Sequence, residues 1–144
     1  MARARFADIL RLLAAEDVEF LVVGMTAGIL HGAPVTTLDL DVVHRRTPEN
    51  VARLLRVLSS LDAVYRQILT TALGDLDCLG TIDQDRGYEE LLEQTVEMKL
   101  AGGLTVRVLS LPALIEAKER SGRPKDLAAL PVLRATLDER DRAR

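Results

Sequence analysis

The sequence predicts an α+β fold in which helices cover a mixed, mostly antiparallel sheet. A short uninterrupted apolar run, Phe20–Val23, has the pattern of a buried strand. Apolar and polar residues alternate over 96–108 on both sides of Gly102-Gly103, which predicts a β-hairpin with a two-residue turn. Residues 3–16 instead repeat their apolar positions at helical spacing. Strands that pair locally, with helices between them, are typical of the α+β class.

The composition narrows the class of protein further. A chain of 144 residues with 48% hydrophobic residues accommodates one domain, which we expect to span residues 1–144. Aromatic residues make up 3% and the net charge is −3, so neither stacked aromatic platforms nor a wholly basic surface is available for nucleic acid. The lone Cys78 excludes an internal disulfide framework. Without a long apolar run, we expect a cytoplasmic protein with no membrane partner.

The first half of the chain alternates helices and strands. The buried strand ends at Gly24, and a short helix over 26–31 is predicted to stop at Gly32. A second strand follows over 38–43. A further helix begins after Thr47, because a capping threonine followed by proline is a typical helix start.

The second half contains the remaining strands and two helices. Short apolar segments at 67–71 and 75–80 flank Gly74, which predicts an antiparallel pair. After the hairpin, residues 111–120 and 125–140 have helical patterns separated by Ser-Gly-Arg-Pro, a signal that stops one helix and restarts another. Pro131 is expected to kink or split the second helix.

Two acidic residues stand out on the second predicted strand. Because side chains alternate along a strand, Leu38, Leu40 and Val42 are expected to face the core. Asp39 and Asp41 then project together from the other face. Two like charges roughly 6–7 Å apart are most easily tolerated with a cation between them, and oxygen ligands suit Mg²⁺ or Mn²⁺. The simpler alternative is a strand with one solvent-facing side.

The segment before this strand adds an anion-binding feature. A helix that starts near Met25-Thr26, directly after Gly24, points free backbone N–H groups toward whatever lies beside the acidic strand. An anion site next to a cation site is what a metal-bound triphosphate requires.

The order of these features resembles the nucleotidyltransferase superfamily with the DNA polymerase β-like catalytic core. In that family a strand ends in glycine, a short helix follows, and a Gly-x-x-Arg-x-Thr-x-Asp-x-Asp segment comes next. The matching positions here are Gly32, Thr37, Asp39 and Asp41. The family also has a third carboxylate on a later strand, which Asp77 in Leu-Asp-Cys-Leu matches. Asp75 lies on the same strand face and is the rival, but Asp77 is preferred because Asp75 adjoins the turn.

Small bacterial members and the toxin-type (AbiEii-like) nucleotidyltransferases are the most similar subgroup. They carry a lysine in a Leu-Ile-x-x-Lys helix and an aspartate in a following Lys-Asp-x-x-x-Leu segment. Lys118 and Asp126 stand at these two positions. The resemblance therefore extends over residues 20–130.

The resemblance implies a metal-dependent transfer of a nucleoside monophosphate from a nucleoside triphosphate to a hydroxyl group of a protein, an RNA such as tRNA, or a small molecule. In this interpretation Lys118 neutralises charge on the leaving pyrophosphate, and Asp126 orients Lys118 or the acceptor. The implied metal ligands, for Mg²⁺ or Mn²⁺, are Asp39, Asp41 and Asp77. The implied nucleotide-binding residues are Gly24, Met25, Thr26 and Thr37.

Two departures from the family pattern favour an alternative function. Met25 stands where relatives have glycine or serine, and Val35 stands where many have arginine. The alternative is a catalytically weak or inactive binding module with this fold, such as one half of a toxin–antitoxin pair acting with a cognate partner protein. A third interpretation is a homo-oligomeric structural protein with the 96–108 hairpin as its interface.

Overall fold

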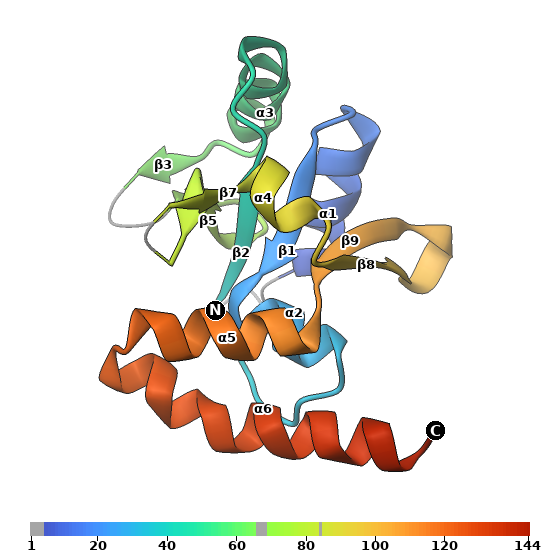
Figure 1. Cartoon of the computed structure of the whole chain (residues 1–144). Coiled ribbons are helices and arrows are strands. Elements are labelled where there is room, and N and C mark those ends of the chain that lie inside the picture. The colour runs from blue at the N-terminus through green and yellow to red at the C-terminus, as the bar shows by residue number, and fades with distance from the viewer. Residues whose placement is uncertain (1–4, 66–68, 84) are drawn as a thin grey trace.

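The computed structural model describes residues 5–65, 69–83 and 85–144, and it is built around one large sheet (Figure 1). Seven strands form this sheet in the order β3-β4-β5-β2-β1-β9-β8. Their bounds are β1 Phe20–Val23, β2 Asp39–His44, β3 Val64–Tyr65, β4 Leu69–Thr71, β5 Gly74–Leu79, β8 Thr95–Lys99 and β9 Thr105–Leu109. A separate two-stranded sheet pairs β6 Thr81–Ile82 with β7 Arg86–Gly87.

The sheet is mixed and mostly antiparallel, as the sequence predicts. Strand β2 lies between β1, to which it is antiparallel, and β5, to which it is parallel. Strand β1 also pairs with β9 in parallel, and the other neighbouring strands of the large sheet pair antiparallel. The central position of β2 brings the residues of two neighbouring strands beside its own acidic pair.

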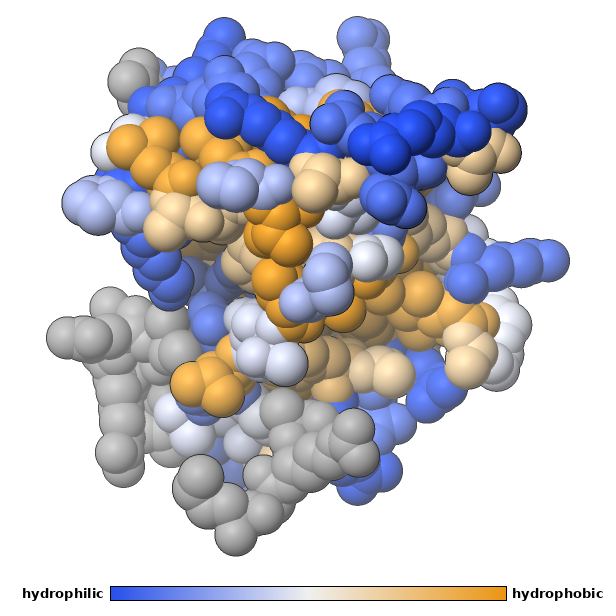
Figure 2. Space-filling view, turned by 90° about the horizontal axis from the view of Figure 1, so that it is seen from below, coloured by the Kyte–Doolittle hydropathy of each residue, from blue (hydrophilic) through white to orange (hydrophobic). Residues whose placement is uncertain are grey.

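Helices cover this sheet and close one end of it. They are α1 Phe6–Ala15, α2 Gly24–Leu30, α3 Pro48–Ser60, α4 Tyr88–Leu92, α5 Leu111–Ser121 and α6 Pro124–Arg142. Helices α5 and α6 pack against each other below the end of the sheet where β1 leads into α2 (Figure 1). On the side of α6, apolar residues gather across the middle of the surface, between hydrophilic margins (Figure 2).

An aliphatic core holds β2 in place. Leu40 and Val42 are buried on one face of the strand, together with Val22 on β1 and Leu76 on β5. Burying each such side chain contributes roughly 1.5–3 kcal/mol, so the register of β2 is strongly determined. Asp39 and Asp41 are therefore held on the opposite face, where they are only half-buried.

Most predicted elements are confirmed, with bounds shifted by a few residues. The helix after Thr47 begins as expected, because the Thr47 hydroxyl accepts a hydrogen bond from the Asn50 N–H and Pro48 occupies the first turn. The antiparallel pair around Gly74 is present as β4 and β5, although residues 67 and 68 of the prediction lie outside the described residues. The N-terminal helix, predicted over 3–16, is present over Phe6–Ala15. Residues 3 and 4 of that prediction lie outside the described residues.

Two expectations about individual positions are wrong. Leu38 does not face the core: it precedes β2 and is 85% exposed. The β8–β9 hairpin has a longer connection than a two-residue turn, since a 3₁₀ turn over Ala101–Gly103 joins the strands. Of the two outcomes expected at Pro131, a kink or a split, the split does not occur, because α6 continues through the proline. Buried leucines on either side of that proline, Leu130 and Leu133, anchor both halves of the helix to the core.

The sequence did not predict β3, β6, β7 and α4. These elements contain between two and five residues each, which is too short for a hydrophobic period to be recognised.

In the described part of the chain, none of the helices combines the length and the apolar character that crossing a bilayer would require.

Candidate active site

Three carboxylates from two neighbouring strands converge at one place. Asp39 and Asp41 come from β2 and Asp77 from β5, and one carboxylate oxygen of each lies within 4.8 Å of the others. The parallel register sets Asp41 directly beside Asp77. Asp75 lies beside Asp39 in the same register but is not part of this triad, in line with the preference for Asp77.

Burial and the charge of neighbouring carboxylates raise the pKa values of Asp41 and Asp77. The pKa of Asp41 is raised to about 7, first by burial and then by the nearby charges of Asp39 and Asp77, while Lys118 acts in the opposite direction. The pKa of Asp77 is also raised, by burial and by Asp39. The cluster therefore favours a bound positive charge, and converging carboxylate oxygens are the ligands that Mg²⁺ and Mn²⁺ prefer. The donor set thus fits a divalent cation.

Two threonine hydroxyls hold the first residue of β2. The Oγ1 atoms of Thr26 and Thr37 each lie 3.2 Å from the backbone oxygen of Asp39, as donors to it. Thr37 Oγ1 is also 3.5 Å from Asp39 Oδ1. The structure thus places both predicted nucleotide-binding threonines in contact with the main chain at Asp39. Their direct contact with a phosphate stays a prediction.

Gly24 packs directly against the triad. Its φ is +64°, a conformation that side chains disfavour, and a Cβ placed on it would lie 2.1 Å from Asp41 Oδ2. Met25, which follows it, packs its side chain against the hydrophobic core. Glycine is therefore required at the end of β1 for two reasons, its backbone conformation and the space that Asp41 occupies.

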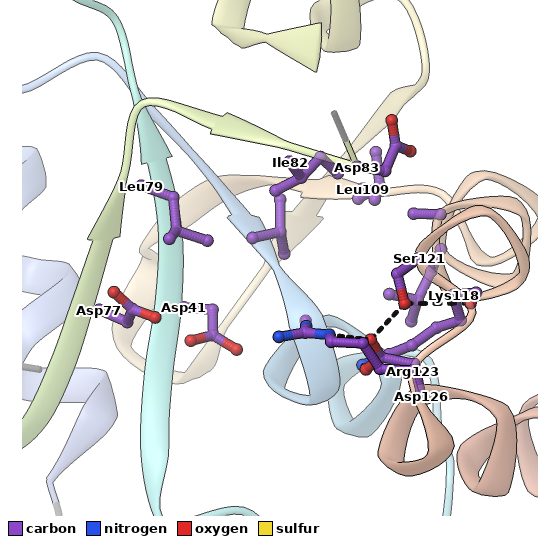
Figure 3. Close-up of a pocket in the computed structure, with 14 residues that line it drawn as sticks. Asp41, Asp77, Leu79, Ile82, Asp83, Leu109, Lys118, Ser121, Arg123 and Asp126 are labelled. Atoms are coloured by element: carbon purple, nitrogen blue, oxygen red, sulfur yellow. Dashed lines mark hydrogen bonds and ion pairs between the residues drawn. The ribbon is translucent and has the colours of Figure 1, made fainter. Parts of the chain in front are cut away.

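A cavity of about 220 Å³ lies between the strand ends and helix α5 (Figure 3). Asp41, Asp77 and Gly24 line one side of it, and Lys118 and Asp126 line the other. Leucine and isoleucine side chains, at Leu79, Ile82, Leu109 and Leu114, supply an apolar wall. The structure thus brings five of the nine predicted site residues to one cavity, with two triad carboxylates on one side and the Lys118–Asp126 pair on the other (Figure 3).

Lys118 and Asp126 form a largely buried ion pair. Lys118 Nζ lies 2.9 Å from Asp126 Oδ1, and the two side chains are 15% and 4% exposed. Burial alone raises the pKa of Asp126, but hydrogen bonds from Ser121, Lys118 and Arg123 outweigh it and lower the pKa to about 2. Asp126 is therefore ionised at neutral pH and holds the ammonium group of Lys118 at the cavity.

The sequence reading did not assign Ser121 or Arg123 to the site, although both line the cavity. Ser121 was interpreted only as part of a helix stop and restart. Arg123, together with Arg120, was considered as a basic rim for an RNA or nucleotide phosphate, but a solvated charge was the preferred explanation. The signal available for both residues was their position, between Lys118 and Asp126 and within a few residues of both.

Comparison by sequence finds no protein-family model and no curated protein that matches this chain. Comparison by structure finds solved nucleotidyltransferase folds. The antibiotic-resistance factor ANT(2'')-Ia in solution has a TM-score of 0.65 at 15% identity, over 92% of this chain and 82% of that one. A "putative nucleotidyltransferase" (TM1012) from Thermotoga maritima has a TM-score of 0.63 at 20% identity, over 93% and 91%.

A second structure of ANT(2'')-Ia, in complex with adenylyl-2''-tobramycin, has a TM-score of 0.62 at 18% identity, over 92% of this chain and 87% of that one. The chain thus has the nucleotidyltransferase fold. Its carboxylate triad is consistent with a catalytic site in that fold.

Proposed function

We propose that this protein is a metal-dependent nucleotidyltransferase that moves a nucleoside monophosphate from a nucleoside triphosphate to a hydroxyl acceptor. The observation that carries the proposal is the convergence of Asp39, Asp41 and Asp77 in a nucleotidyltransferase fold, where Asp41 and Asp77 line a cavity opposite Lys118. A triphosphate requires positive charge on more than one side, and this cavity offers a cation-binding triad and an ammonium group.

The triad would hold Mg²⁺ or Mn²⁺. When bound, such an ion supplies charge neutralisation for the triphosphate and lowers the pKa of a coordinated hydroxyl. Thr37 would keep Asp39 in place through the hydroxyl contact described above. Asp77, whose pKa is raised, is suited to accept the proton of the acceptor hydroxyl or to complete a second cation site.

The opposite side of the cavity would bind the phosphates. Lys118 has three N–H donors, of which one meets Asp126 in the described contacts, so further donors can reach a phosphate oxygen. Its charge would neutralise the leaving pyrophosphate as the bond to the transferred phosphorus breaks. Gly24, without a side chain, would let the backbone approach the nucleotide beside Asp41.

The acceptor is proposed to be a hydroxyl of a small molecule, an RNA such as tRNA, or a protein. The ANT(2'')-Ia complex contains a nucleotide-derived ligand, adenylyl-2''-tobramycin, which supports testing small-molecule hydroxyls first. Membership of the AbiEii-like toxin subgroup and a cognate antitoxin partner remain proposals from the sequence resemblance. A homo-oligomer that uses the 96–108 hairpin and a cytoplasmic location remain proposals from the sequence pattern alone.

A specific observation favours a second candidate, a module that binds nucleotides without turnover. Met25 packs its side chain against the core, and the Thr26 hydroxyl bonds to the Asp39 backbone. Neither residue therefore offers the free hydroxyl that a Gly-Ser pair would supply. Nucleotide binding without any transfer would support this second candidate over the enzyme.

Asp77→Asn is expected to weaken Mg²⁺-dependent nucleotide binding at least tenfold, because it removes one charged oxygen ligand from the triad. Isothermal titration calorimetry with ATP, GTP, CTP and UTP, each with and without Mg²⁺, measures this. Asp75→Asn is the matched control, since Asp75 lies two residues away on the same strand and outside the triad. It is expected to bind within twofold of the wild type. Equal binding by both variants and the wild type would contradict the proposal.

A further inference from the structure

The Asp126 side chain is the centre of a hydrogen-bond network at the corner between α5 and α6. Its Oδ1 accepts a hydrogen bond from Lys118 Nζ at 2.9 Å. Its Oδ2 accepts one from Arg123 Nε at 2.8 Å and one from the Ser121 hydroxyl. Figure 3 shows these side chains meeting at one side of the cavity, across from Asp41 and Asp77.

The chain path explains why these groups meet. Helix α5 ends at Ser121, and Gly122 adopts a φ of +63°, which reverses the chain direction. Helix α6 begins at Pro124, so Asp126 lies in its first turn. Ser121 and Arg123 thus approach the same carboxylate oxygen from either side of the reversal.

We infer that Ser121 is a positioning residue, whose hydroxyl fixes the Asp126 carboxylate so that Lys118 and Arg123 present their positive charge to a phosphate in the cavity. The inference rests on the proposed function. It assigns a role to a residue that the nucleotidyltransferase resemblance does not include.

The exposure of the donors shows why the hydroxyl matters. The Arg123 side chain is 77% exposed, whereas the Asp126 side chain is 4% exposed. A long exposed arginine restricts a carboxylate weakly, because water competes for it and its side chain keeps many rotamers. Ser121 is short and attached to the last turn of α5, so its donor position is set by the helix itself. Without it, Oδ2 of Asp126 would depend on Arg123 alone among the described contacts.

The direction of the Ser121 hydroxyl supports this assignment. Ser121 Oγ lies 3.3 Å from the backbone oxygen of Lys118 and also contacts Asp126 Oδ2. A hydroxyl has one proton to donate, and a charged carboxylate is the stronger acceptor. Donation from Ser121 is among the causes that hold the pKa of Asp126 low.

The test compares Ser121→Ala and Ser121→Thr with a matched control, Ser60→Ala. Ser60 also lies at a helix end, where its hydroxyl donates to the backbone oxygen of Val57 three residues earlier, at 2.7 Å. Ser60→Ala therefore removes the same type of helix-end hydrogen bond without affecting a carboxylate. For each variant the Kd of ATP with Mg²⁺ is measured by calorimetry, and the pKa of the Asp126 carboxyl by NMR titration.

Ser121→Ala is expected to raise both the Kd for Mg²⁺–ATP, about three- to tenfold, and the pKa of Asp126. Ser121→Thr, which keeps the hydroxyl, is expected to restore both, and Ser60→Ala to change neither. An unchanged Kd and pKa in Ser121→Ala, or an equal loss in Ser60→Ala, would overturn the inference. If the wild type binds no nucleotide, the proposed function fails, and the NMR titration still decides whether Ser121 holds Asp126.

Discussion

Asp41→Asn is expected to stabilise the metal-free protein at pH 8 by about 2–4 kcal/mol and to remove its stabilisation by Mg²⁺. Asparagine has nearly the same shape as aspartate but carries no charge. It therefore removes the cost of burying a charge at this position and the repulsion from Asp39 and Asp77, and it leaves the contact with Gly24 unchanged. The measurement is chemical denaturation of the wild type and the variant, with and without Mg²⁺.

The pH dependence of this effect follows from the raised pKa of Asp41. In the folded protein the pKa is about 7 against an ordinary value of 3.8, so between these values the folded state binds more protons than the unfolded state. This contribution to the stability of the metal-free wild type is present below pH 4 and is lost as the pH rises through 7. The difference between Asp41→Asn and the wild type should therefore grow from pH 4 to pH 8.

Asp75→Asn serves as the control for this experiment as well. Asp75 lies on β5, beside Asp39 of β2, but outside the triad, so the variant removes a nearby charge without removing a triad ligand. It is expected to keep the stabilisation by Mg²⁺. Two results would contradict the account. One is a wild-type free energy of unfolding at pH 8 that does not change when Mg²⁺ is added. The other is a metal-free Asp41→Asn variant that is less stable than the metal-free wild type at pH 8.

Gly24→Ala is expected to weaken Mg²⁺-dependent ATP binding, raising its Kd at least tenfold. An alanine Cβ would lie 2.1 Å from Asp41 Oδ2 and 2.9 Å from Asp41 Cγ, so the Asp41 carboxylate must leave its place in the triad. The positive φ of +64° adds a backbone cost of about 1–2 kcal/mol. Calorimetry measures the binding, and thermal unfolding measures the stability.

Gly103→Ala separates the backbone cost from the displacement of Asp41. Gly103 has a φ of +79° in the β8–β9 connection, and a Cβ there would meet nothing within 4 Å. Both variants should lose stability through the positive φ, but only Gly24→Ala should lose nucleotide binding. Retained binding in Gly24→Ala would show that the position of Asp41 beside Gly24 is not needed for the site.

The triad could be predicted because it depends on local patterns. Strand alternation places Asp39 and Asp41 on one face, and the buried Leu40 and Val42 make that register the only favourable one. The choice of Asp77 over Asp75 was harder, because both share a strand face. The parallel register sets Asp75 beside Asp39 and Asp77 beside Asp41, so only the convergence of the carboxylate oxygens groups Asp77 with the pair.

The opposite side of the cavity could be predicted only in part. Lys118 and Asp126 were found through the family resemblance, but their contact depends on how α5 and α6 pack. Ser121 was missed and Arg123 was given the simpler explanation of a solvated charge, because a Ser-Gly-Arg-Pro segment indicates a helix boundary whether or not its side chains reach a site. Their role follows from the chain reversal at Gly122, which brings both side chains to Asp126. The hydrophobic periodicity of the sequence does not predict this contact.

The most direct test of the central claim is the fate of the α-phosphate of a nucleoside triphosphate. The protein is incubated with Mg²⁺ and ATP labelled at either the α- or the γ-phosphate, together with small-molecule, RNA and protein fractions of a cell extract. The account predicts covalent transfer of the α-label by the wild type, and none by Asp41→Asn. Transfer of the γ-label instead, or α-label transfer that persists in Asp41→Asn, would contradict it.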